Sequence, residues 1–410
     1  MVTEILTAAR AVEPWSLDLL ERLVAEPSVT GQSSKIDEIL AEELAGLGLD
    51  VETIPCDPVP WASDPEFSPP VCLEDGAPAT VVATLGQARR NPRLLLFAHT
   101  DTEPVSEGWR TQPFELRRQG GRLFGLGVAD DLSGVVNILA SIRLLLKLDA
   151  PRAFDPVIVL GPGKQGGALG TLPGVASAAH LDRAIYVHPP ETRRGLSELK
   201  CASRGVATFT MNVPGRTPAP VEERTPVSAD PKSGINAAVR AARLVARLES
   251  DPPGGGTWAV TGVRACSAPY EVPGQASVEV AVWFRGGTVD DRGADLTGWL
   301  AREAADGFET THPVGFELTG LRANPAACTD DDWIDLVAST VADVAGYRPH
   351  RYDGHAASDI RFPLRRHGVP TIGLGCLAGN FYGCDEWIDE RSWHLTTVAV
   401  AAILAGRDGR

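Results

Sequence analysis

The sequence predicts an α/β fold, in which a larger domain with a mixed, largely parallel sheet flanked by helices is interrupted by a smaller α+β domain with an antiparallel sheet. At 410 residues the chain is too long for one compact core. Continuous apolar strands alternate with helical patterns before residue 198 and after residue 313, whereas residues 199–312 alternate polar and apolar side chains. We therefore expect a discontinuous α/β domain, residues 1–198 and 313–410, and an inserted domain, residues 199–312.

The first part of the chain predicts helices, a long loop and strands, in that order. Residues 16–48 carry two amphipathic helical patterns, and residues 55–79 are rich in proline and aspartate. The segments TVVAT (80–84) and RLLLFA (93–98) are typical of strands. The turn GQARRNP separates them, so we expect a hairpin or a pair of neighbouring strands. Residues 125–147 begin with a glycine-rich turn and continue as an apolar helix.

Polar side chains at the ends of three predicted strands indicate one site. One buried strand ends in His99, and a second, VIVLG, runs into Lys164 and Gln165. A third, RAIYV, ends at His188, and Asp130 opens the helix that lies between these strands in the sequence. Because sites form at the carboxyl ends of buried strands, we expect these side chains at one edge of the sheet.

The pair His99 and Asp101 favours a metal site, with a ligating imidazole and a neighbouring carboxylate that fixes its tautomer. The alternative is a strand end whose His and Asp merely pair at the surface. The glycine-rich turn matches a phosphate-binding turn only weakly, because Asp130 and Asp131 would repel a pyrophosphate.

Composition and charge narrow the partners. The net charge of −15 argues against nucleic acid or an anionic membrane as a partner. Seven cysteines without a C-x-x-C pair indicate reduced thiols in a cytoplasm rather than a disulfide framework. The acidic N-terminus is no signal peptide, and no apolar stretch reaches the length of a membrane span. We therefore expect a cytoplasmic protein without nucleic-acid or membrane partners.

Taken together, several stretches resemble the dizinc aminoacylase and carboxypeptidase family, which includes acetylornithine deacetylase, succinyl-diaminopimelate desuccinylase and bacterial glutamate carboxypeptidase. The matching stretches cover essentially the whole chain in order and spacing: FAHTDTEP…GW (97–109), GLGVADDLSG (125–134), KQGGALGT (164–171), GINAA (234–238), ASDIRF (357–362) and GNFYGCDEW (379–387). The resemblance implies a catalytic domain interrupted by a lid domain, through which members often dimerise. It therefore implies a homodimer formed through the lid.

The family's chemistry needs a carboxylate that bridges two zinc ions, one His and one further carboxylate for each ion, and a free Glu that deprotonates the water. By resemblance, His99, Asp101 and Asp130 match this pattern. The adjacent Glu pair, base and then ligand, falls on Lys164 and Gln165.

The two remaining ligands also differ from the pattern, since the acid after the third strand falls on His188 and the C-terminal His falls on Tyr382. One zinc ion would use His99, Asp130 and His188, which is a sound set because imidazole is a good zinc ligand. The other ion would need Asp130, Gln165 and Tyr382, and a neutral amide and a phenol are poor ligands. A two-metal centre is therefore disfavoured.

The replacements add as much positive charge, relative to the family pattern, as two zinc ions carry. The ammonium of Lys164 would then stand where a metal charge was. The alternatives are that Lys164 is a solvated loop residue and that Tyr382 is a packed aromatic side chain. The cofactor prediction is thus a single zinc ion or no metal.

Candidate substrate-binding residues come from both domains. The family's lid His should lie within 213–235, where there is none, and its lid Asn falls on Tyr270. Arg285 ends a lid strand and is suited either to clamping a substrate carboxylate or to a surface ion pair. Asp359 and Arg361 lie in a loop that lines the pocket in the family, and the alternative for them is a structural ion pair.

These features lead us to expect an enzyme that acts on the C–N amide bond of a small N-acyl or peptidyl amino-acid derivative. Because the usual dizinc route is disfavoured, Lys164 or Tyr382 would transfer the proton, and Gln165 and Asp101 complete the predicted catalytic set. Such a pocket also suits acyl transfer, cyclisation or elimination, where water activation is unwanted. The alternative is a non-catalytic homologue that binds a small amino-acid derivative or partners an active subunit.

Overall fold

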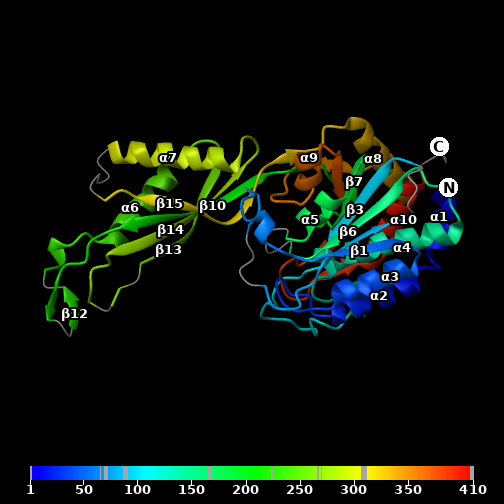
Figure 1. Ribbon diagram of the computed structural model, residues 1–410, viewed down its shortest axis with the longest axis horizontal. Coiled ribbons are helices and arrows are strands. Elements are labelled where there is room, and N and C mark those ends of the chain that lie inside the picture. The colour runs from blue at the N-terminus through cyan, green and yellow to red at the C-terminus, as the bar shows by residue number, and fades with distance from the viewer. Residues whose placement is uncertain are drawn as a thin grey trace. The chain divides into compact units, whose positions relative to one another are not determined.

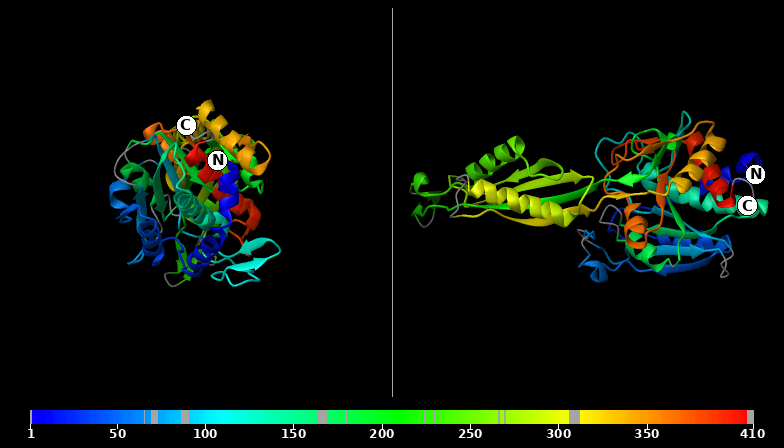
Figure 2. Two further views of the ribbon diagram at one scale, coloured as in Figure 1. Left: turned by 90° about the vertical axis from the view of Figure 1, so that its right-hand side faces the viewer. Right: turned by 90° about the horizontal axis from the view of Figure 1, so that it is seen from above.

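The computed structural model describes residues 2–406, apart from 65, 69–72, 86–90, 164–168, 179, 223–224, 229, 266, 269 and 306–311. The chain divides into two compact units, which Figures 1 and 2 show from three sides. The larger unit comprises Met1–Ser203 and Ala326–Arg410, and the inserted unit comprises Arg204–Pro325. Both boundaries lie further along the chain than the predicted ones. The second moves because the strand Gly315–Ala323 pairs within the inserted sheet.

An eight-stranded mixed sheet forms the centre of the larger unit, as predicted (Figure 1). Its strands, in spatial order, are β1 (Asp50–Ile54), β2 (Thr80–Thr84), β6 (Asp155–Gly161), β3 (Arg93–His99), β7 (Arg183–Val187), β18 (Thr371–Leu374), β8 (Glu198–Lys200) and β17 (His350–Tyr352). The prediction that β2 and β3 are a hairpin or neighbours is wrong, because β6 lies between them. β6 pairs antiparallel with β2 and parallel with β3, so it satisfies the backbone groups of both.

Helices cover both faces of this sheet. Those on one face are α1 (Val2–Ala9), α2 (Glu13–Ala25), α3 (Ile36–Gly46), α4 (Ser133–Leu148), α8 (Asp331–Ala345) and α10 (Glu390–Ala405), and those on the other are α5 (Thr171–Ser177) and α9 (Arg361–His367). Within β3, Leu94 and Leu96 join the first core, whereas Leu95 and Phe97 join the second. Burial on both faces explains the unbroken apolar run of this strand. Among the helices of the described residues, none has the length and apolar character needed to cross a bilayer.

A smaller sheet in the same unit brings a C-terminal loop close to the glycine-rich turn. Its strands, in order, are β19 (Ala378–Gly379), β20 (Trp387–Asp389), β5 (Arg122–Phe124) and β4 (Arg117–Gln119). β20 pairs with β5, which directly precedes the glycine-rich turn and the kinked segment Val128–Leu132 before α4. Glu386, which directly precedes β20, therefore lies beside the segment that carries Asp130.

The inserted unit is an α+β structure with an antiparallel sheet, as predicted. Its strands, in order, are β13 (Thr257–Arg264), β14 (Gln275–Phe284), β10 (Gly205–Pro214) and β15 (Gly315–Ala323). Helices α6 (Ala237–Ser250) and α7 (Val289–Ala305) share one apolar core with alternate residues of these strands. A short ladder, β11 (Pro220–Glu222) with β12 (Thr225–Ser228), extends from it.

Two short strands carry the chain between the units. β9 (Ala202–Ser203) leads out of the larger unit and β16 (Ala326–Ala327) leads back into it. They pair antiparallel with each other.

Candidate metal centre

Three of the predicted side chains converge at the carboxyl edge of the large sheet. His99 is the last residue of β3, and His188 directly follows β7, the neighbouring parallel strand. Asp130 lies in the segment Val128–Leu132 before α4, where its own backbone is not helical (φ −132°, ψ 79°). All three residues are buried, and one possible ligand atom from each lies within 4.8 Å of the others.

Both imidazoles contact the same carboxylate oxygen. Nε2 of His99 lies 2.8 Å and Nε2 of His188 lies 2.7 Å from Oδ1 of Asp130. The other nitrogens face oxygen acceptors, with Nδ1 of His188 2.6 Å from the Pro189 carbonyl oxygen and Nδ1 of His99 3.0 Å from the Asp101 carbonyl oxygen. We assign the ring proton to Nδ1 in each case, since a carbonyl oxygen only accepts.

This assignment makes the site suitable for a cation. With the proton on Nδ1, a neutral imidazole directs the lone pair of Nε2 at a carboxylate oxygen, which is also an acceptor. Two acceptors at such a distance repel unless a positive charge, either a second proton on each ring or a metal ion, stands between them. Two imidazoles and a carboxylate are a donor set that zinc uses.

Asp101 and Thr30 hold the ring of His99. Oδ1 of Asp101 lies 3.2 Å from Nδ1 of His99, and the Thr30 hydroxyl donates to Oδ2 of Asp101 at 2.6 Å. Asp101 is only 1% exposed, so the surface-pair alternative does not describe it. The contact is the one that a carboxylate orienting a ligating imidazole would make.

Glu386 fixes the turn that carries Asp130, and sequence reasoning missed this role although the residue lies in a matching stretch. Its carboxylate accepts backbone N–H groups from Gly127 at 3.0 Å, Ala129 at 2.7 Å and Asp130 at 2.9 Å. Burial and the charge of Asp130 raise the pKa of Glu386 to about 8, although the three N–H groups oppose this shift. Carboxyl groups whose pKa is raised this far are typical of functional sites.

A second group of charged residues surrounds Glu191, on the Nδ1 side of His188. Glu191 lies 2.9 Å from Nδ1 of His355, 3.5 Å from Nζ of Lys200 and 4.0 Å from Nδ1 of His188. Burial opposes ionisation, but Lys200 and His355 hold the pKa of Glu191 well below its usual range. The sequence analysis did not single out Glu191, Lys200 or His355. The only local signal was that Glu191 follows His188 by three residues.

Aromatic rings enclose His188. The Tyr186 ring stacks on it with 4.8 Å between centroids, and Phe381 lies 6.5 Å from it on nearly parallel planes. Phe97 stacks in turn on Tyr186. These rings exclude water and strengthen the electrostatic interactions of the cluster.

The other predicted catalytic residues are either outside the described residues or exposed. Lys164 and Gln165 lie outside the described residues, so their predicted roles stay predictions. Tyr382 is 49% exposed and has a φ of 61° in the loop between β19 and β20. Its neighbour Phe381, not Tyr382, stacks on His188.

The predicted substrate-binding residues are divided between the units. Asp359 and Arg361 are buried and form an ion pair with each other at 3.1 Å, and their predicted role toward a substrate stays a prediction. Tyr270, which is 85% exposed, and Arg285, also exposed, belong to the inserted unit.

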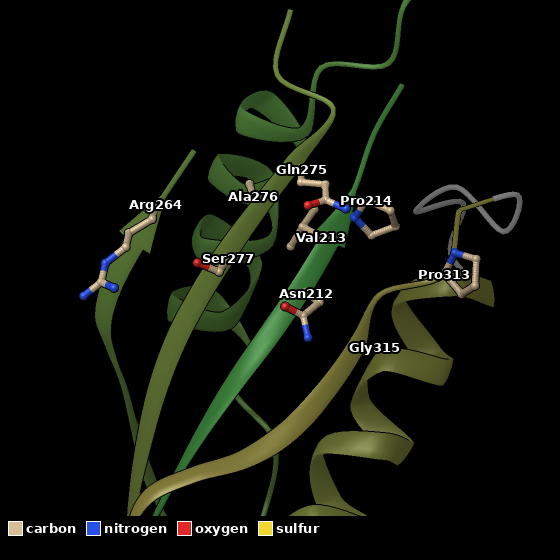
Figure 3. Close-up of a pocket in the computed structure, with 9 residues that line it drawn as sticks. All are labelled: Asn212, Val213, Pro214, Arg264, Gln275, Ala276, Ser277, Pro313 and Gly315. Atoms are coloured by element: carbon tan, nitrogen blue, oxygen red, sulfur yellow. The ribbon is translucent and has the colours of Figure 1, made fainter. Parts of the chain in front are cut away.

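A hollow of about 490 Å³ lies on the inserted unit, and none of the predicted site residues that the structure describes lines it (Figure 3). Arg264, Ser277, Asn212 and Gly315 occupy directly paired positions on its four strands. Figure 3 shows this row crossing the hollow, with small side chains at its centre. Arg264 is paired with Glu279 on the next strand, and nothing in the hollow identifies a ligand.

The fold and the cluster define a class of protein: a two-unit α/β protein with a candidate metal centre at the strand ends of its larger unit. A match to the model of Peptidase family M20/M25/M40 spans residues 95–406. The chain belongs to this family, which confirms the resemblance seen in the sequence.

Two curated relatives cover nearly all of the chain. Succinyl-diaminopimelate desuccinylase of Gluconacetobacter diazotrophicus is 25% identical over 403 residues, which are 95% of this chain and 96% of the relative. The enzyme of the same name from Methylorubrum extorquens is 27% identical over 409 residues, 95% of this chain and 97% of the relative.

Solved structures share the fold at lower identity. A tripeptidase of Staphylococcus aureus has a TM-score of 0.73 and 19% identity, with 96% of this chain and 98% of that chain covered. Human carnosine dipeptidase 1 has a TM-score of 0.68 and 13% identity, with 99% of each chain covered.

Proposed function

We propose that the protein cleaves the C–N amide bond of a small N-acyl or peptidyl amino-acid derivative, with one divalent cation held by His99, Asp130 and His188. Membership of a peptidase family supports action on an amide bond. The observation that carries the single-cation site is that both Nε2 atoms face one carboxylate oxygen, while both Nδ1 atoms face acceptors.

A zinc ion bound there would supply a Lewis acid that polarises the substrate carbonyl. The chain's own residues would keep this site in place. Asp101 and the Pro189 carbonyl orient the two imidazoles, and Glu386 fixes the turn that carries Asp130. The buried ring of Tyr186 and the half-buried ring of Phe381 shield the ligand His188 from water.

Proton transfer needs a group other than the usual Glu, because that position holds Lys164 in this sequence. Lys164 and Tyr382 are the candidates from the sequence, and His355, which contacts Glu191 at 2.9 Å, is a third candidate. The Glu191 carboxylate faces Nδ1 of His355, so Nδ1 keeps its proton and Nε2 is the atom that takes up or releases one.

The first test is the metal content of purified protein after zinc is offered and excess is removed. We expect about one zinc ion per chain in the wild type, and loss of it in His188→Ala and Asp130→Asn. The exposed His367→Ala is a matched control and should keep the metal. Wild-type protein that binds no zinc would contradict the site.

The second test offers N-acetyl and N-succinyl amino acids and dipeptides to the zinc-loaded protein. Release of a free amine supports hydrolysis, and loss of turnover in Lys164→Met with unchanged ligand affinity assigns Lys164 to the reaction. Hydrolysis also releases the free acid, whereas, with an acceptor amine added, an N-acylated acceptor formed without free acid indicates acyl transfer. Ligand binding without any turnover would support the non-catalytic alternative.

The predicted homodimer through the inserted unit is part of the same proposal. Sedimentation equilibrium of the full chain tests it, and a monomer at all concentrations would contradict it.

A further inference from the structure

Two cysteines face each other beside the strands that connect the units. β9 and β16 are antiparallel, with Ala202 opposite Ala327. One step further along this register Cys201 lies opposite Cys328, and the Cys328 N–H donates to the Cys201 carbonyl oxygen at 2.8 Å. Directly opposed residues of an antiparallel pair have Cα atoms about 4.5–5.5 Å apart and side chains on the same face. Cα atoms joined by a disulfide are usually about 4.4–6.8 Å apart, so the pairing suits a bond between these two thiols.

The environment of the two sulfurs agrees with this placement. Both thiols are free, and the residues are 6% and 7% exposed in one shared apolar core. Burial and the neighbouring Cys328 thiol raise the pKa of Cys201 to about 12, and burial also raises the pKa of Cys328. Thiols of high pKa are poor leaving groups, so a disulfide between them would form slowly and resist reduction.

We propose that Cys201 and Cys328 are a dithiol site which a low-molecular-weight organic disulfide oxidises to an intramolecular disulfide. The thiolate of one cysteine attacks the reagent, which forms a mixed disulfide and releases one reagent thiol. The thiolate of the second cysteine then attacks the protein sulfur of that mixed disulfide and expels the other half of the reagent. In sum, the protein loses two S–H hydrogens and gains one S–S bond, and the reagent S–S bond is reduced to two thiols.

The bond would have a mechanical consequence, because β9 and β16 are the segments through which the chain leaves and re-enters the larger unit. A covalent link directly beside this ladder keeps the two connecting strands paired. We expect slower amide hydrogen exchange in 202–203 and 326–327 after oxidation, because opening of a short ladder is what permits exchange.

The test treats native full-length protein with oxidised glutathione, blocks remaining thiols with N-ethylmaleimide, and maps tryptic peptides by mass spectrometry. Cleavage after Lys200 and Arg204 isolates Cys201 on its own short peptide. We expect this peptide joined to the one that contains Cys328, and a mass loss of about 2 Da with no glutathione retained at either cysteine. In Cys328→Ser, Cys201 should instead keep a mixed disulfide with glutathione. Cys376→Ser, which removes a different buried thiol, should leave the cross-link intact.

Two results would overturn the proposal, and a third would refute only its mechanical consequence. One is glutathione on both cysteines without a link between them. Another is that both cysteines react with maleimide once the treated protein is unfolded, although oxidised glutathione has oxidised Cys384 in the same sample. Both thiols would then be inert toward the reagent. A third is a cross-link that leaves hydrogen exchange in 202–203 and 326–327 unchanged, which would refute the mechanical consequence.

Discussion

Replacement of Glu386 by alanine tests how the turn that carries Asp130 is held. The side chain is 2% exposed, and its carboxylate accepts three backbone N–H groups, from Gly127, Ala129 and Asp130. Each such bond contributes about 1 kcal/mol net, and a buried donor left without a partner costs about 1–3 kcal/mol. Relief of carboxyl burial offsets part of this cost. We therefore expect Glu386→Ala to lower the free energy of unfolding by about 3 kcal/mol.

Glu386→Gln provides a graded control, because glutamine keeps the shape of the side chain. Its single carbonyl oxygen can still accept the N–H groups of Ala129 and Asp130, which share Oε1 in the wild type. Its amide nitrogen would face the N–H of Gly127, so one bond of the three is lost. The expected destabilisation is about 1 kcal/mol.

The assay is urea unfolding followed by tryptophan fluorescence, together with zinc affinity from a competing chelator. Because support of a metal ligand changes affinity about 10–100-fold, Glu386→Ala should bind zinc at least about 10-fold more weakly than wild type. A destabilisation below about 1 kcal/mol in the alanine variant would refute the hydrogen-bond accounting. Unchanged zinc affinity in a destabilised variant would separate Glu386 from the metal site.

Three further predictions follow from packing and charge. Gly134→Ala would place a methyl group against a backbone carbonyl of β7 and should lower the free energy of unfolding by about 3 kcal/mol. Gly298→Ala, in open space on α7, should instead raise it by about 0.5–1 kcal/mol. Chemical unfolding measures both variants. Glu191→Gln should cost more than Lys200→Met in the same assay, because it deprives an ammonium that is 1% exposed of its carboxylate, whereas removal of Lys200 leaves the Glu191 carboxylate its contact with His355 at 2.9 Å. Burial raises the pKa of Cys376 to about 12, so its thiolate fraction rises only as the pH approaches that value. Iodoacetamide should therefore leave Cys376 unmodified at pH 8 in native protein. Fast alkylation at that pH would contradict its burial.

The sequence predicted the site residues that lie at strand ends and at the start of a helix. His99 and His188 each follow an apolar run buried on both faces, and Asp130 opens an apolar helix. Because parallel strands bring such ends to one edge, local pattern sufficed to group these residues. The same logic failed for β2 and β3, whose separation by β6 depends on pairing between segments distant in the sequence.

The supporting residues were beyond the reach of sequence pattern. Lys200 lies on β8 and His355 lies in the loop after β17, and both contact Glu191. Glu386 meets its backbone partners across most of the chain, and a carboxylate that accepts backbone N–H groups leaves no spacing to recognise. Such contacts are set by tertiary packing, and only the fold reveals them.

The position of β18 has a consequence for the synthesis of the chain. This strand lies between β7 and β8, although the whole inserted unit separates it from both in the sequence. The first segment of the larger unit, Met1–Ser203, therefore leaves the ribosome with an open edge at β7, while the contiguous inserted unit emerges with all its strands and helices. A chain that stops before β18 would carry a complete inserted unit on an unfinished sheet, with the unpaired edge that favours aggregation.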